Sequence, residues 1–131
     1  MYEFHGWLGL AESTEESEIS RLQPIIDELR TLLAGFVWPN VKVALLLLNG
    51  TYFLTITANV NRRRSEAAQI EKVIHFISER LPGSWGLLYE RDDETTAPPG
   101  PNAFRVRTVA RGRVEEHTDP FLSPCRPTIE D

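Results

Sequence analysis

The side chains best suited to metal binding or nucleophilic catalysis are three histidines and one cysteine. His5, His75 and His117 are far apart in the sequence, and none stands at a metal-ligand spacing from another such residue. Cys125 is followed by Arg126, which could activate the thiol, but no histidine is adjacent to it. The eight glycines form no phosphate-binding motif. We therefore expect no metal, no cofactor and no enzymatic activity, and interpret Cys125 as a packed thiol.

Carboxylates are the most abundant candidate groups. Asp92, Asp93 and Glu94 follow a predicted strand that contains Tyr89, in a loop where functional residues are common. Neighbouring acids could perform acid–base chemistry or hold a divalent ion, and a solvated acidic turn is the simpler interpretation. Because adjacent acids point in different directions and no other catalytic group accompanies them, we favour protein binding over catalysis as their role.

Arginines gather at residues 62–64 and again at Arg105, Arg107, Arg111 and Arg113. Arg105 and Arg107 would share one face of a strand, which could bind nucleic acid. The chain as a whole has a net charge of −5, and nucleic-acid-binding domains usually carry a basic face. We therefore expect no nucleic-acid partner and interpret these arginines as paired with nearby acids.

The length of 131 residues predicts a single domain, residues 1–131, large enough to fold without disulfides or metals. The lone cysteine cannot form an internal disulfide, so a reducing cytoplasm is the expected compartment. The N-terminus lacks a basic start followed by a long apolar run, and the longest apolar stretch, residues 43–48, is too short to span a bilayer. We expect no signal peptide and no membrane contact.

Hydrophobic periodicity predicts two helices that flank a hairpin. Apolar residues recur at helical spacing in two segments, which are Ile19, Leu22, Ile26, Leu29 and Leu33, then Ile70, Val73, Ile74, Ile77 and Leu81. Pro24 interrupts the first helix, which either starts near Ser20 or is kinked at the proline, and Ser65 is a candidate N-cap of the second. Residues 41–48 are apolar on both alternating sets, which is typical of a strand covered on both faces. Asn49-Gly50 predicts a tight turn into a return strand at 51–60.

Further strands are expected near the N-terminus and after the second helix, at 85–90 and 104–110, with a short pairing segment at 114–117. The resulting order is β-α-β-β-α-β-β. This order indicates an α+β two-layer sandwich, in which two helices pack on a mostly antiparallel sheet of about five strands, related in layout to the ferredoxin-like split β-α-β unit. The order of the strands beyond the hairpin does not follow from the sequence.

Three segments of the chain resemble the immunity protein 7 family of bacterial polymorphic toxin systems. They are the opening MYEFHGW, the segment WGLLYERDDE at 85–94, and the ending RG followed by DPFLSPC at 119–125. The resemblance covers nearly the whole chain in the same order. It implies a protein that is encoded beside a toxin, has no catalysis of its own, and protects the cell by binding the toxin domain. Such toxins are diverse, and many are nucleases.

The resemblance carries over no verified contact residues, so the toxin-binding site is predicted from residue chemistry alone. Tyrosine and tryptophan are common anchors at protein interfaces, and acids suit a basic partner. The candidates are Tyr89, Asp92, Asp93 and Glu94, followed by Trp7, Glu115 and Glu116. Two other functions stay open, which are a small-molecule regulatory module of ferredoxin-like layout and an enzyme that uses Cys125.

Overall fold

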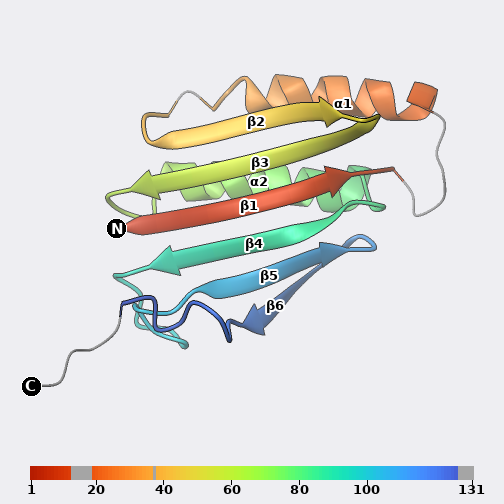
Figure 1. Ribbon diagram of the computed structural model, residues 1–131. Coiled ribbons are helices and arrows are strands. Elements are labelled where there is room, and N and C mark those ends of the chain that lie inside the picture. Colours follow the sequence, from red (N-terminus) through yellow and green to blue (C-terminus); the bar gives the residue numbers. More distant parts are fainter. Residues whose placement is uncertain (13–18, 37, 127–131) are drawn as a thin grey trace, which may run out of the picture.

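The computed structural model describes residues 1–12, 19–36 and 38–126. It contains two helices and six strands (Figure 1), which are β1 (Tyr2–Leu10), α1 (Ile19–Leu33), β2 (Val41–Leu48), β3 (Thr51–Val60), α2 (Ser65–Arg80), β4 (Trp85–Asp92), β5 (Arg105–Ala110) and β6 (Arg113–Thr118). The α+β class and the two helices on an antiparallel sheet are confirmed. The segment near 114–117 is a full sixth strand because it forms a hairpin with β5.

Two tight turns fix the hairpins of the sheet. Asn49 and Gly50 both have positive φ, at 49° and 80°, as a type I′ turn requires. Arg111 and Gly112 repeat this geometry between β5 and β6, at 53° and 73°. The twist of such turns matches the twist of the strands that they join, so both hairpins close with no extra residues.

All six strands form one antiparallel sheet in the order β2-β3-β1-β4-β5-β6. β3 lies between β1 and β2, and β1 lies between β3 and β4. Each helix therefore connects two strands that are separated by a third, which is the split β-α-β layout expected from the sequence. β5 and β6 extend this sheet at one side, and β2 and β6 are its edges.

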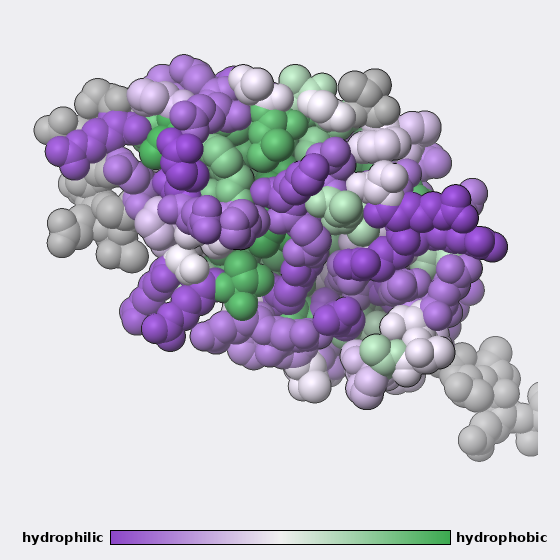
Figure 2. Space-filling view, turned by 180° about the vertical axis from the view of Figure 1, so that it is seen from behind, coloured by the Kyte–Doolittle hydropathy of each residue, from purple (hydrophilic) through white to green (hydrophobic). Residues whose placement is uncertain are grey.

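Both helices lie on the same face of the sheet, behind it in Figure 1. Alternate residues of β1 and β3 point toward them and form the core together with one face of each helix; the largest fully buried side chains of these elements are Tyr2, Phe4, Leu8, Leu54, Ile56, Ile26, Leu29, Ile70 and Ile77. The outer side of the helix layer carries mostly hydrophilic side chains (Figure 2). None of the helices in the described part of the chain is both long and apolar enough to cross a membrane.

Three local predictions need correction or refinement. The strand at 41–48 is not covered on both faces, because both helices lie on one face of the sheet, and Leu46, Leu47 and Leu48 are exposed. Ser65 is the first helical residue of α2, and the N-cap position is Arg64, which makes no side-chain capping hydrogen bond. Helix α1 spans Ile19–Leu33, which agrees with the predicted start near Ser20 to one residue, and Pro24 lies inside it.

Candidate protein interface

The face of the sheet opposite the helices is where side chains accessible to a large partner gather. Because side chains alternate along a strand, residues between the core positions of β1 to β4 point to this open face. Its apolar members form what we call the open-face patch, namely Trp7, Leu46, Leu48, Phe53, Trp85 and Leu87. Trp7 and Trp85 are 44% and 43% exposed, so both tryptophans of the predicted strands are accessible.

Strand register places the patch residues side by side. Leu46 pairs with Phe53, Phe53 with Gly9, and Gly9 with Trp85, which gives one continuous row across four strands. In the next row, Trp7 lies between Thr55 and Leu87. The patch therefore occupies the half of the open face near the Asn49-Gly50 turn, at the right of Figure 1.

The Trp85 side chain is held in a defined position. A β-carbon at Gly9 would lie 2.3 Å from the indole, so the ring lies directly over this glycine. The indole packs against Phe53 in a T-shaped arrangement, with 6.5 Å between ring centroids and 83° between ring planes. Aromatic pairs favour this geometry, which makes the indole a preformed surface feature.

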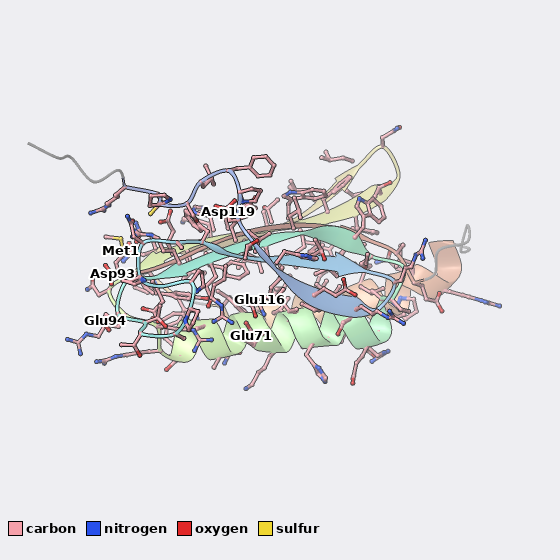
Figure 3. The ribbon with its side chains drawn as sticks, turned by 90° about the horizontal axis from the view of Figure 1, so that it is seen from below. Met1, Glu71, Asp93, Glu94, Glu116 and Asp119 are labelled. Atoms are coloured by element: carbon pink, nitrogen blue, oxygen red, sulfur yellow. The ribbon has the colours of Figure 1, made fainter. Side chains whose placement is uncertain are left out.

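The part of the open face around Phe104 and Val106 is covered by the chain itself. Residues 119–126 lie on the side of the sheet away from α2 (Figure 3). Ser123 Oγ accepts a hydrogen bond from the Phe104 amide, and the Cys125 amide donates to the Asn102 carbonyl. Phe104 is 7% exposed and Val106 is 6% exposed, although both belong to the sheet's open side. We call residues 119–126 the C-terminal strap.

The strap presents two apolar side chains to solvent. Phe121 is 82% exposed and Leu122 is 52% exposed. Asp119 fixes this turn, because its carboxylate accepts hydrogen bonds from both of their amides and from the Ser123 hydroxyl. These hydrogen bonds hold the backbone of the turn that carries the exposed pair.

Asp92, Asp93 and Glu94 lie at the end of β4 that is opposite Trp85. Asp92 Oδ1 accepts a hydrogen bond from the Glu94 amide, which closes the turn after β4. Asp93 bonds to the terminal amine of Met1, and this hydrogen bond, followed by the charges of the amine, Arg91 and Arg126, lowers the pKa of its carboxyl. Glu94 is 3.5 Å from Arg62. All three acids therefore have structural partners, although Asp93 and Glu94 stay exposed at the surface.

The remaining predicted residues divide between the two faces. Trp7, Tyr89 and Glu115 point to the open face, where Tyr89 packs edge-on against Phe104 with centroids 5.7 Å apart. Glu116 points to the helix side. It pairs there with Arg105 at 2.6 Å, and this hydrogen bond lowers the pKa of the Glu116 carboxyl. The structure therefore brings Trp7, Tyr89 and Glu115 onto one surface and places Glu116 apart from them.

A buried carboxylate that the sequence analysis did not single out organises the helix side. Glu90 is 5% exposed and accepts a hydrogen bond from the Tyr2 hydroxyl at 2.9 Å. Its carboxylate lies within 4.0 Å of three arginines, Arg63, Arg105 and Arg107. Burial raises the pKa of Tyr2, and the adjacent negative charge of Glu90 raises it further. Side chains alternate along β4, so Glu90 is expected to point to the core side as Leu88 does. This alternation is the signal in the sequence that could have identified the site.

The arginines of this network are compensated by acids. Arg107 donates two hydrogen bonds to Glu71, at 3.0 and 2.8 Å. Burial alone would lower the pKa of the Arg107 guanidinium. The hydrogen bonds and negative charge of Glu71 outweigh this effect of burial, so the pKa is raised. Arg63, Arg105 and Arg107 face Glu71, Glu90 and Glu116 in equal number. Arg105 and Arg107, the two arginines predicted to share one face of a strand, are therefore both paired with acids.

The histidines and the cysteine do not converge. His5 bonds to Glu3, His75 lies 3.2 Å from Glu79 on the same helix, and His117 bonds to Thr108. Cys125 is half-buried in the strap, where its thiol donates to Asn102 Oδ1. Within residues 1–12, 19–36 and 38–126, no group of three histidine, cysteine or acidic side chains could hold a metal ion.

A shallow groove lies between the end of α1 and β2. It is lined mainly by apolar side chains, among them Phe36, Trp38 and Val43, with Arg30 and Lys42 as its cations. A small-molecule regulator of this layout would require a ligand site, and this groove is one hollow that could hold a ligand.

The architecture is that of a small two-layer α+β domain whose sheet keeps one face largely bare. The family model described as Immunity protein 7 matches residues 1–131, the whole chain, and the chain belongs to this family. The family places it among the immunity proteins of bacterial toxin systems, whose partner is a toxin and which are generally not enzymes. No curated protein and no solved structure matches the chain.

Proposed function

We propose that this protein neutralises one cognate toxin in the cytoplasm of the producing cell by direct, stoichiometric binding, and that it catalyses no reaction. The observation that carries this proposal is the match to an immunity protein family over the entire chain. The chemistry of the described side chains agrees with it, because the histidines are dispersed and the buried carboxylate serves an ion network. A binding protein needs only a preformed surface that complements its partner.

Charge supports a basic toxin as the partner. The chain carries a net charge of −5, and complementary fields accelerate the encounter of two proteins. Asp93 and Glu94 stay exposed although each has one partner, and Glu115 is exposed on the open face. We assign these acids to long-range attraction, and Trp7 and Tyr89 to direct contact. Nucleases, which bind polyanions, are a toxin class that would suit this arrangement.

The test is a titration of the toxin domain that is encoded by the neighbouring gene. Its activity is measured at a fixed toxin concentration far above the dissociation constant while this protein is added. Direct binding predicts a linear loss of activity that ends at one equivalent, with a 1:1 complex in size-exclusion chromatography with light scattering. An enzyme that modified the toxin would instead abolish its activity at well below one equivalent.

A control separates sequestration from covalent modification. The inhibited toxin is denatured, separated from this protein and refolded, and its mass and activity are compared with those of untreated toxin. Binding predicts an unchanged mass and recovered activity. A changed mass, or activity that does not return while untreated toxin recovers, would contradict the proposal.

A further inference from the structure

We infer that the toxin docks on the open face of the sheet, with the open-face patch at the centre of the contact and the exposed pair of the C-terminal strap beside it. This inference rests on the proposed function and names the surface that performs it. Its occupant is one folded toxin domain that offers an apolar, uncharged centre to Trp7, Trp85 and Leu46.

β2 is more apolar than is usual for an edge strand. Its sequence is apolar on both alternating sets, as in a strand that is buried from both sides. The helices cover Val41, Val43 and Leu45 of one set and leave only its last member, Leu47, exposed. On the other set, Leu46 and Leu48 remain 42% and 55% exposed. An edge strand that stays free in the cell is usually protected by charges, yet β2 contains a single charged residue, Lys42. β6, the opposite edge, carries four charged or titratable residues among its six. The contrast indicates that the β2 side of the open face is covered by a partner.

Exposed apolar side chains are distributed unequally between the two sides of the molecule. Nine large apolar side chains are exposed among the described residues, and six of them belong to this side of the molecule; the six are Trp7, Leu46, Leu48, Trp85, Phe121 and Leu122. Exposed apolar side chains gathered on one surface mark interaction sites, whereas scattered ones do not. The helix side is mostly hydrophilic (Figure 2).

The aromatic centre of the open-face patch is preorganised for binding. Gly9 lets the Trp85 indole lie against the sheet, and Phe53 packs against the indole. A side chain that is already fixed loses little conformational entropy on binding, and buried tryptophans are frequent hot spots. The hydrogen bonds of Asp119 restrain the backbone of Phe121 and Leu122.

The size and charge of the surface decide the kind of occupant. Six strands at a spacing of about 4.8 Å, each about eight residues long at about 3.3 Å per residue, give this side of the sheet on the order of 750 Å², the area under the C-terminal strap included. A standard protein interface takes about 800 Å² from each partner, so one folded domain fills the face and a short peptide does not. Two copies of this chain would repel each other through their net charge of −5, whereas a basic toxin would be attracted.

The test uses two neighbouring leucines of β2 that point to opposite faces. Leu46 belongs to the patch, and Leu47 is 57% exposed on the other side of the same strand. Leu46→Glu and Leu47→Glu add the same charge to the same edge strand. Binding of the purified toxin domain is measured by calorimetry, and folding of each variant by circular dichroism and thermal unfolding. We expect Leu46→Glu to weaken binding by about 100-fold or more and Leu47→Glu to change it by less than about 3-fold.

A second variant tests the same surface without introducing a charge that could disturb folding. Trp7→Ala with Trp85→Ala removes both anchors without adding charge, and the same loss of affinity is expected. If the wild-type protein binds the toxin and both the Leu46→Glu and the double-alanine proteins bind it as tightly, the docking surface is wrong while the proposed function stands. If the wild-type protein does not bind the toxin, both fail. If the free protein is a dimer that Leu46→Glu dissociates, a second copy covers the face and the inference is overturned.

Discussion

The indole of Trp85 lies directly over Gly9 on the adjacent strand, at a position where any other residue would place a β-carbon 2.3 Å from the ring. Gly86, the next residue of β4, faces the opposite way, and a β-carbon there would lie 2.0 Å from the Trp7 carbonyl oxygen. The two glycines therefore have different roles. Gly9 gives room to an exposed side chain, whereas Gly86 permits the close approach of two backbones.

Gly9→Ala should displace the Trp85 indole from the sheet and leave the fold intact, since an exposed ring can rotate away. We expect a change in stability within about 1 kcal/mol. The indole N–H signal of Trp85 in the NMR spectrum, assigned with Trp85→Phe, should shift, and toxin binding should weaken. Gly86→Ala is the contrasting control and should cost about 3 kcal/mol, because the backbone of β1 cannot move aside. An unmoved Trp85 signal in Gly9→Ala would contradict this account of the patch.

Asp93→Lys with Glu94→Lys should slow association with the toxin without unfolding the protein. Each acid-to-lysine change adds two charges, so the net charge rises from −5 to −1. Steering acts mainly on the association rate, and we expect a decrease of about 3- to 10-fold at low salt that shrinks at high salt. Stopped-flow mixing with the toxin domain measures it. Asp27→Lys with Glu79→Lys on the helices makes the same charge change as a control, and an equal slowing there would argue against a local role of the acidic loop.

Glu90→Ala should strongly destabilise the protein. The substitution leaves the Tyr2 hydroxyl without its acceptor and removes the carboxylate that Arg63, Arg105 and Arg107 share. Loss of one partner from a buried ion network typically costs about 3–5 kcal/mol. Urea unfolding measures the change, and Glu90→Gln, which keeps a hydrogen-bond acceptor, should cost less. A change below about 1 kcal/mol for the alanine variant would show that the network contributes little.

Alkaline pH should destabilise the protein through Tyr2. Burial and the negative charge of Glu90 raise the pKa of this hydroxyl in the folded state. The unfolded chain ionises at the ordinary tyrosine pKa, so stability is retained below about pH 10 and lost as the pH rises above it. Urea unfolding at pH 8 to 11 should show this decrease in the wild-type protein, and Tyr2→Phe should reduce the slope. An equal slope in both proteins would mean that another group controls the transition.

Much of the fold could be predicted from the sequence because its signals are local. The helical spacing of apolar residues located both helices, and Asn49-Gly50 located the central hairpin to the residue. The order of the strands depends on pairing between distant segments, such as β1 with β4, and no local pattern encodes it. The interpretation of 41–48 as a strand covered on both faces failed because hydrophobicity shows that both sides are apolar but not which partner covers each side.

The candidate interface was predicted only in part for the same reason. Trp7, Tyr89 and Glu115 were chosen by residue type and do share the open face. Leu46 and Phe53 were assigned to two strands without a role, because the sequence does not show that one face of the sheet lacks a covering layer. The acids of residues 92–94 drew attention as a charge cluster, although contacts with Met1 and Arg62, far away in the sequence, occupy two of them.

The most direct test of the account is survival of the producing cell. The gene for this protein is deleted while the neighbouring toxin gene is kept, and variants are supplied from an inducible plasmid at equal protein levels. The account predicts that cells without the protein die when the toxin is expressed, that the wild type and Leu47→Glu restore growth, and that Leu46→Glu does not. Undiminished growth of the deletion strain in the presence of active toxin, or full rescue by Leu46→Glu, would contradict it.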